Sequence, residues 1–530
     1  AGTAVLIFAI IARLFRGKND PPRADVDAGE RLLTFGYKPE IWAAIAALTW
    51  AFYLPAQAFS IVAMPTTLGV FAFWLVVAVI VNREQPPTLA GWFLLGALVG
   101  ITAMGVATIL FLIPLLLFAI LRRWAPVTKG KTLRQLAGAA ILLAGVASGT
   151  APCWLHNTLV AHDPVFLSAH SGVNLWIGNN PDATGYPHFG DLPAAQRKML
   201  DASITRAEAA AGRPLKRSEV SAFWSAKARG YISGHLAAWL RLLGVKMWNF
   251  WNAFQYDDLS VVSKLREQGI IFAGPRFGIV AAAALAAIPF VLRRWKDSRW
   301  ILGAILLQML ALLPVFVTER YRLAAVPGLI ILAVLGLSHF WECCVARRVR
   351  PAVFYAALLV FAALLVSSAP TDPGLWALDP YNAGREALDG GDLPRAQQKL
   401  ELAHAYVPQN PEINLALGNL WLARGNPERA RQSYIETLRA QPGHKAALSN
   451  LGVLAWQEKQ LDRAAGFFRA AIAIAPDDAK THYLLASALL GAGRQAEAQA
   501  EADIAVKLQP DQPEFADLQR RVRSDPAPSR

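Results

Sequence analysis

Residues 410–442 read NPEINLALGNLWLARGNPERARQSYIETLRAQP, and the same spacing of residues returns through the last third of the chain. Prolines recur every 34 residues, at Pro408, Pro442, Pro476 and Pro510. Small residues recur in phase with these prolines: Gly384, Gly418, Gly452 and Ala486, and twelve residues after each of them Ala396, Ala430, Ala464 and Ala498. A fixed period of this length indicates a solenoid of stacked helical units.

The period matches the tetratricopeptide repeat, a helix–turn–helix unit. We expect the small residues where the two helices of a unit touch, and the prolines after each second helix. Larger apolar residues should fill the space around them: Leu417, Trp421, Tyr434, Leu451 and Phe468. The pattern predicts about four repeats over residues 377–522, a linker at 370–376 and a tail at 523–530, with fraying already from 520. The concave face of such a solenoid is expected to bind a protein partner or acceptor.

The composition upstream of the repeats is different. The 530-residue chain is 55% hydrophobic and 17% charged, whereas soluble globular chains carry about a quarter charged residues. The deficit of charge lies in residues 1–370, which predicts a membrane domain at 1–369 followed by a soluble domain. The net charge of +14 does not indicate nucleic acid, because no basic face with interleaved aromatic residues is visible. Cys153, Cys343 and Cys344 lack metal-binding spacing, so no metal site is expected.

Ten apolar segments are each close to the length that crosses a hydrocarbon core. They are residues 1–15, 41–63, 66–81, 89–104, 106–121, 136–153, 271–292, 301–317, 323–340 and 353–367. The run from 89 to 121 is too long for one span, and Gly105 is the expected break within it.

Basic residues follow the first, fifth, seventh and ninth of these segments. They are Arg13, Arg16, Lys18 and Arg23; Arg122, Arg123, Lys129, Lys131 and Arg134; Arg293, Arg294, Lys296 and Arg299; and Arg347, Arg348 and Arg350. Ten alternating spans put all four groups on one side, which the positive-inside rule makes cytoplasmic. Residues 154–270 and the C-terminal repeats then lie outside the cytoplasm. The fold class expected is all-α: a polytopic transmembrane helix bundle with an extracytoplasmic loop domain, followed by a tetratricopeptide-repeat α-solenoid.

The loop domain has helical periodicity over residues 193–254. Trp224, Tyr231, Trp239, Leu243 and Trp251 recur on one helix face. Basic residues stand beside them: Arg229, Arg241 and Lys246. A Trp-rich amphipathic helix suits a membrane interface, but it could equally pack on the rest of the loop domain.

Three stretches carry a resemblance to a known family: TAPCWLHN at 150–157, GVNLWIGNNPDATG at 172–185 and TERYRLAAVPGL at 318–329. With the order of apolar segments, they make residues 1–370 similar to the bacterial C-type (GT-C) glycosyltransferases related to protein-mannosyltransferases and aminoarabinose transferases. Some members of that family also carry C-terminal tetratricopeptide repeats. The resemblance implies transfer of a sugar from a polyprenyl-phosphate donor, without a cofactor, at the outer face of the bacterial cytoplasmic membrane.

In that family the general base is a carboxylate in the first outer loop. The chain begins at Ala1 inside an apolar run, so we expect a longer parent protein with the catalytic residue upstream of Ala1. The catalytic residue therefore has no number in this sequence.

The donor phosphate needs cations, and planar guanidinium groups suit it. Arg320 and Arg322, which flank Tyr321, are the phosphate-binding candidates; alternatively, they form an interfacial pair with Glu319. His156 and Asn157 stand where relatives have an Arg-Asn pair, and they either contact the phosphate or cap a helix at the membrane edge.

The loop residues Asn179, Asn180 and Asp182 could bind hydroxyls of the donor sugar, although these residue types also form ordinary turns. The pair Asp257 and Asp258 is expected to be a solvated helix end rather than a catalytic group.

The sequence departs from the family pattern at three places. Thr66 or Thr67 stands where relatives often have an acidic residue, the stretch around Val106 lacks an Arg, and His156 replaces an Arg. The alternative to an enzyme is a non-catalytic membrane scaffold that gathers envelope proteins through its repeats. A transporter is disfavoured, since no intramembrane carboxylate is visible among the apolar segments.

Overall fold

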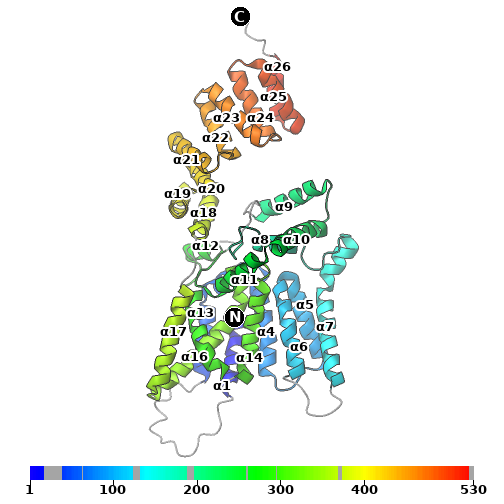
Figure 1. The fold of residues 1–530 in the computed structure, drawn as a ribbon, viewed down its shortest axis with the longest axis vertical. Coiled ribbons are helices and arrows are strands. Elements are labelled where there is room, and N and C mark those ends of the chain that lie inside the picture. The colour runs from blue at the N-terminus through cyan, green and yellow to red at the C-terminus, as the bar shows by residue number, and fades with distance from the viewer. Residues whose placement is uncertain are drawn as a thin grey trace, which may run out of the picture. The chain divides into compact units, whose positions relative to one another are not determined.

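The computed structural model describes residues 1–16, 39–62, 64–122, 132–187, 196–257, 261–293, 295–367 and 373–524. Among these residues there are helices and no strand, which confirms the all-α class. The chain forms two compact units, Ala1–Pro370 and Thr371–Arg530, and each is described by itself (Figure 1).

The first unit combines long apolar helices with a group of shorter ones at one end of the bundle (Figure 1). The helices of the bundle are α1 (Gly2–Arg16), α2 (Pro39–Ala51), α3 (Leu54–Ile61), α4 (Pro65–Asn82), α5 (Leu89–Gly105), η2 (Ala107–Leu112), α6 (Ile113–Arg122), α7 (Thr132–Leu155), α13 (Phe277–Leu292), α14 (Trp295–Leu312), α16 (Val326–Val345) and α17 (Val349–Ser367). The shorter elements are η3 (His156–Val160), α8 (Ser171–Gly178), α9 (Gln196–Ala211), α10 (Arg217–Gly234), α11 (Leu236–Trp251), α12 (Val261–Glu267), α15 (Glu319–Arg322) and η4 (Leu323–Ala325).

Each of the ten apolar segments overlaps helix in the described residues, although residues 271–276 and 313–317 of two of them are not helical. Four helical stretches are long and apolar enough to cross a membrane, namely Pro65–Asn82, Leu133–Val160, Glu319–Val345 and Val349–Ser367, and a bent pair of helices makes up to five. The other apolar helices have 10–17 residues, so they fall short of the roughly 20 residues that cover a hydrocarbon core.

The segment 41–63 was expected to be one span, and in the structure it is a bent pair of helices rather than one continuous helix. It consists of α2 and α3, whose axes differ by 57°, while Ala63 lies outside the described residues. The physical reason is Pro55 in the first turn of α3. A proline there has no N–H to donate and its ring clashes with the preceding turn, so the first helix must end before it.

The expected break in the run from 89 to 121 is confirmed, because α5 ends at Gly105 and a 3₁₀ turn follows. The expected helix over 193–254 is divided into α9, α10 and α11, with residues 188–195 outside the described part. Several residues of the basic groups are also outside it: Lys18, Arg23, Arg123, Lys129, Lys131 and Arg294.

Two glycine pairs let α5 and α7 approach each other very closely. A Cβ built on Gly96 would lie 2.1 Å from the carbonyl oxygen of Leu142, and one on Gly100 would lie 2.3 Å from that of Val146. The partner helix repeats this arrangement at Gly145 and Gly149, whose built Cβ atoms would lie 2.2 and 2.4 Å from carbonyl oxygens of α5. Backbone-to-backbone packing of small residues is how apolar helices associate where burial from water cannot drive them together.

The second unit consists of helix pairs that follow the 34-residue period. They are α18 (Pro373–Asp389) with α19 (Leu393–Tyr406), α20 (Pro411–Ala423) with α21 (Pro427–Ala440), α22 (Lys445–Gln457) with α23 (Leu461–Ile474), and α24 (Ala479–Gly491) with α25 (Gln495–Leu508), followed by α26 (Pro513–Ser524). The expected role of the small residues is confirmed. A Cβ built on Gly418 would lie 2.3 Å from the Tyr434 ring, and one on Gly452 would lie 2.5 Å from the Phe468 ring.

Both ends of the repeat unit differ from the expectation. Residues 373–376 of the expected linker belong to α18, and the fraying expected from 520 is wrong, because α26 continues to Ser524. The reason is that Phe515, Leu518 and Val522 are buried at helical spacing, so this helix has an apolar face to bury. Residues 525–530 of the expected tail lie outside the described part.

Candidate functional site

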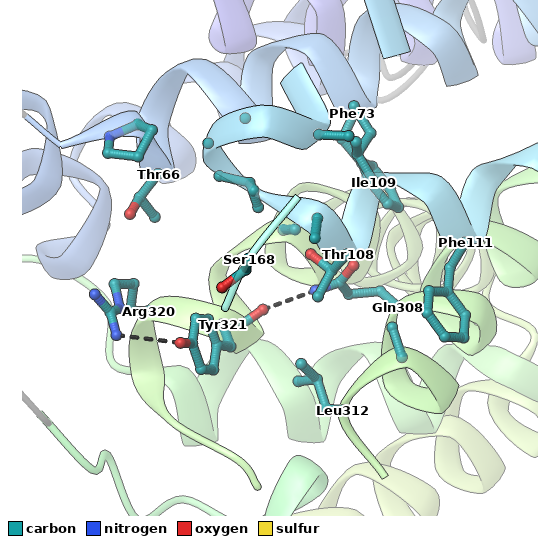
Figure 2. Close-up of a pocket in the computed structure, with 18 of the residues that line it drawn as sticks. Thr66, Phe73, Thr108, Ile109, Phe111, Ser168, Gln308, Leu312, Arg320 and Tyr321 are labelled. Atoms are coloured by element: carbon teal, nitrogen blue, oxygen red, sulfur yellow. Dashed lines mark hydrogen bonds between the residues drawn. The ribbon is translucent and has the colours of Figure 1, made fainter. Parts of the chain in front are cut away.

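A cavity of about 580 Å³ lies in the first unit, where five separate segments meet. Five segments make its wall: the start of α4 around Thr66, the end of α5 with η2 around Val106, the loop at Leu167 and Ser168 with the start of α8 up to Asn174, the end of α14 with Gln308, and α15 with Arg320 and Tyr321. Figure 2 shows Thr66, Ser168, Gln308, Arg320 and Tyr321 around the cavity. Its lining is mostly apolar, with hydroxyl and amide groups from Thr66, Thr108, Ser168, Ser171, Asn174 and Gln308.

The cavity brings together segments that the sequence singled out separately. Thr66 and Val106, both departures from the family pattern, lie in the same wall as Arg320 and Tyr321. More than 200 residues of sequence separate the two pairs, and no local pattern links them.

Arg320 is the one charged residue among the described residues that line the cavity. It is half-buried, its guanidinium lies 4.8 Å from the centre of the Tyr321 ring, and Nη2 donates to the Tyr321 hydroxyl at 3.4 Å (Figure 2). A guanidinium can stack on an aromatic ring and can also donate hydrogen bonds to a planar anion.

The backbone of α15 and of the turn η4 that follows it is held from three sides. The Thr318 hydroxyl caps the Tyr321 N–H at 3.3 Å, Gln308 Nε2 donates to the Tyr321 carbonyl at 2.8 Å, and Trp74 Nε1 donates to the Ala324 carbonyl at 2.8 Å. These bonds come from a loop, α14 and α4, so they fix the helix that carries Arg320.

Arg322, the other phosphate-binding candidate, does not line the cavity. It is fully buried and donates to Glu319 at 2.5 Å. It also donates to the carbonyls of Asn249, Phe250, Asn252 and Phe254. Glu319 in turn accepts from the Tyr53 hydroxyl at 2.5 Å. The expected pairing with Glu319 is present, but it is an interior ion pair and not an interfacial one. Arg322 is a structural residue that joins α15 to the end of α11.

His156 and Asn157 also lie away from the cavity wall. They begin the π-helical turn η3 that extends α7. His156 is exposed, and Asn157 Nδ2 donates to the Val165 carbonyl at 2.9 Å. The bond of Asn157 matches the alternative of a helix-end cap, since it ties the helix end to the loop that follows.

Asn179 and Asn180 are buried and serve the loop's own structure. Asn179 Nδ2 donates to the Leu175 and Pro314 carbonyls. Asn180 Oδ1 accepts from the Asp182 N–H at 3.0 Å, which is an ordinary Asx turn. Asp182 is not part of the cavity wall. The turn-forming alternative for this loop therefore fits the geometry better than sugar binding.

Asp257 lies before the start of α12, half-buried, and not at a solvated end of the Trp-rich helix α11. Its carboxylate oxygens accept from the N–H groups of Val261 and Ser263 at the start of α12, at 3.2 and 3.0 Å. Asp258, the other member of the pair, lies outside the described residues. The geometry gives Asp257 a capping role.

Lys246, one of the basic residues that stand beside the Trp-rich face in the sequence, lies in the interior of the first unit. It is 0% exposed, and Nζ donates to Asn179 Oδ1 and to the Leu313 carbonyl, both at 3.0 Å. Burial lowers its pKa to about 7, since neither of these acceptors is a full negative charge. Lys246 is the single basic residue in the stretch LGVKMWNF at 243–250. This local sequence does not indicate that the lysine is buried, and its burial follows only from the three-dimensional structure.

The cavity can bind an amphiphile, with apolar walls for a chain and Arg320 with several hydroxyls for a polar head. Its described lining contains no carboxylate, so these residues can hold an anion but cannot accept a proton from an acceptor hydroxyl. No cluster of His, Cys, Asp and Glu that could hold a metal occurs among the described residues.

Comparison with known families bears on the second unit. Two family models, both described as tetratricopeptide repeat, match residues 381–435 and 415–479 and residues 455–522. The C-terminal part of the chain is therefore built of tetratricopeptide repeats, whose general role is protein–protein interaction. No curated protein matches the chain.

Three solved structures are similar to parts or most of the chain. Pseudomonas aeruginosa pilF is 21% identical over 28% of this chain and 69% of its own, with a TM-score of 0.26. TTC0263, a thermophilic TPR protein in Thermus thermophilus, is 21% identical over 35% and 96%, with a TM-score of 0.24. The APC/C hetero-tetramer Cut9-Hcn1 is 14% identical over 93% and 94%, with a TM-score of 0.27. All three TM-scores lie below 0.5, so the assignment of the repeats rests on the family models.

Proposed function

We propose that the chain belongs to a membrane-embedded glycosyltransferase that holds a polyprenyl-phosphate sugar in the cavity beside Arg320. In this proposal the first unit lies in the bacterial cytoplasmic membrane with the cavity toward its outer face. The repeats bind the protein partner or acceptor outside the cytoplasm. The observation that carries the proposal is the cavity, because its single described cation faces a mostly apolar space.

The chemistry assigns one task to Arg320. When the sugar leaves, the bond between the anomeric carbon and the phosphate oxygen breaks, and charge grows on the phosphate. A guanidinium within reach stabilises that charge in the transition state. The acceptor oxygen forms the new bond to the anomeric carbon, and its proton goes to a base that is not among the described residues of the cavity.

The experiment uses the protein with any residues that precede Ala1 included, reconstituted in lipid vesicles together with a polyprenyl-phosphate sugar whose sugar is radiolabelled. Transfer to acceptor is compared between the natural chain, Arg320→Gln and Arg276→Gln. Arg276 is a matched control, because it is an exposed arginine at the start of α13 and does not line the cavity. Arg320→Gln should reduce transfer at least about tenfold, the effect of losing one charge-assisted hydrogen bond. Equal transfer by both variants would refute the assignment of Arg320.

A second candidate is a non-catalytic membrane scaffold that gathers envelope proteins through its repeats. The observation that favours it is the lack of a carboxylate among the described residues of the cavity. The two candidates differ in one result. A chain that binds the lipid donor but releases no sugar to any acceptor, with or without its protein partner, supports the scaffold.

A further inference from the structure

We infer that α11 lies in the plane of the membrane surface, with its outward face in contact with the lipid of the outer leaflet. This inference rests on the proposed embedding of the first unit and assigns an interaction surface that the cavity does not use. Figure 1 shows α11 running across the end of the helix bundle, beside α8 and α10.

The observation that supports this inference is that α11 turns an apolar stripe outward, where a helix in water would place polar residues. Its inward face holds Lys246 and Asn249, both 0% exposed, beside the buried Leu242 and Phe250. Its outward face holds Leu236 and Leu240, each 56% exposed, and Met247, 45% exposed. A surface helix of a soluble protein places its apolar stripe toward the core and its polar residues outward. The outward apolar stripe, together with two polar side chains turned inward, indicates that the medium outside α11 is apolar.

The spacing places the exposed side chains on one face. Leu240 follows Leu236 by four residues, and Met247 follows Leu240 by seven, so all three lie within one stripe of the helix. Gly244 completes this stripe, and a Cβ built there would meet nothing within 4 Å. The stripe is therefore a continuous and unobstructed apolar surface.

Charge and aromatic content identify the occupant as a lipid surface. Among the residues of α11 there is no Asp or Glu, and the exposed charge at the edge of the stripe is Arg241, which suits anionic headgroups. Trp239, Trp248 and Trp251 are half-buried along the same helix. Tryptophan concentrates at the depth where headgroups meet acyl chains, so a bilayer fits this face better than a protein does.

The inward face connects this surface to the cavity. Trp239 Nε1 and Lys246 Nζ both donate to Asn179 Oδ1. Asn179 donates to the Pro314 carbonyl, and the next residue, Val315, lines the cavity. A helix fixed at the membrane surface thus also fixes one wall of the cavity.

The test measures depth in the bilayer by electron paramagnetic resonance. A ketone-bearing amino acid coupled to a nitroxide is placed singly at Leu240, Met247, Phe361 or Ala210, so that the native cysteines stay. The full chain is reconstituted in nanodiscs of phosphatidylethanolamine and anionic phosphatidylglycerol. Collision with oxygen reports lipid, and collision with a water-soluble nickel chelate reports solvent.

Phe361 on α17 and Ala210 on α9 are the controls, because both are exposed and only Phe361 belongs to a helix long enough to span. We expect the oxygen-to-nickel ratio at Leu240 and Met247 to lie above that at Ala210 and below that at Phe361. Values at Leu240 and Met247 equal to Ala210, with a lipid-like Phe361, overturn the inference and leave the embedding intact. A water-like Phe361 overturns the embedding and the inference together. Size-exclusion chromatography of each labelled chain shows whether it has kept its fold.

Discussion

Arg322 Nη2 donates a 2.5 Å hydrogen bond to Glu319 Oε2, and each of the two side chains exposes 1% of its surface. The same guanidinium lies over the Phe277 ring and donates to carbonyls at the end of α11. The pair therefore fastens α15, which carries Arg320, to α11 and α13. Its role is to hold the cavity wall and not to contact the ligand.

Arg322→Ala should lower the free energy of unfolding by about 3–5 kcal/mol, since removal of one partner leaves the other charge buried and uncompensated. Arg322→Lys should restore little, because a lysine cannot reach Glu319 and several carbonyls at once. Chemical unfolding in detergent measures both, and Arg276→Ala is the exposed control, expected within about 0.5 kcal/mol of the natural chain. An Arg322→Ala protein as stable as this control would show that the ion pair is dispensable.

Lys246 should make stability depend on pH. Its pKa is lowered from 10.5 to about 7, so between these values the unfolded lysine is charged while the folded one is neutral. The unfolded state then binds more protons, and stability rises with pH across this window. The natural chain should gain stability relative to Lys246→Met as pH rises from about 7 to 10.5. A difference that stays constant over the window would mean that Lys246 is not titrating in this way.

The contact between α5 and α7 should tolerate no side chain at its glycines. Gly149→Ala would place Cβ 2.4 Å from the Ala97 carbonyl oxygen, so the helices must separate, at a cost of about 1–3 kcal/mol. Gly230→Ala in α10 is the control, because its Cβ meets nothing within 4 Å, and alanine should stabilise that helix by about 0.5–1 kcal/mol. Thermal unfolding of the two variants should shift in opposite directions; a shift in the same direction would refute the close contact.

In the repeats, Gly418→Val should disrupt one unit, since even its Cβ would lie 2.3 Å from the Tyr434 ring. Limited proteolysis of the full chain should then cleave between α20 and α21 faster than in the natural protein. Gly466→Ala in α23 meets nothing within 4 Å and should leave the cleavage rate unchanged. Equal rates for all three chains would contradict the packing described.

The periodic features could be predicted from the sequence, because each depends on residues close together along the chain. The 34-residue spacing predicted the repeats, and Gly105 predicted the break after α5. The bend after α2 was missed although Pro55 signals it, since the apolar run continues through it unchanged.

The site was predicted only in part. Arg320 and Tyr321 line the cavity together with Thr66, but Arg322, on the same short segment, faces the interior. Which of two neighbouring arginines faces a cavity depends on the packing of helices that are distant in the sequence. The burial of Lys246 depends on such packing too, because the sequence of its helix indicates only an amphipathic helix. The sequence contains no local signal for either orientation.

The most direct measurement of the central claim is the binding of polyprenyl phosphate, without sugar, to the full chain in nanodiscs, observed by native mass spectrometry. The natural chain and Arg276→Gln should bind it alike, and Arg320→Gln should bind it about tenfold to hundredfold more weakly, since a hydrogen bond to a charged group contributes about 1.5–3 kcal/mol. Equal binding by the natural chain and Arg320→Gln, or no binding at all, would contradict the account.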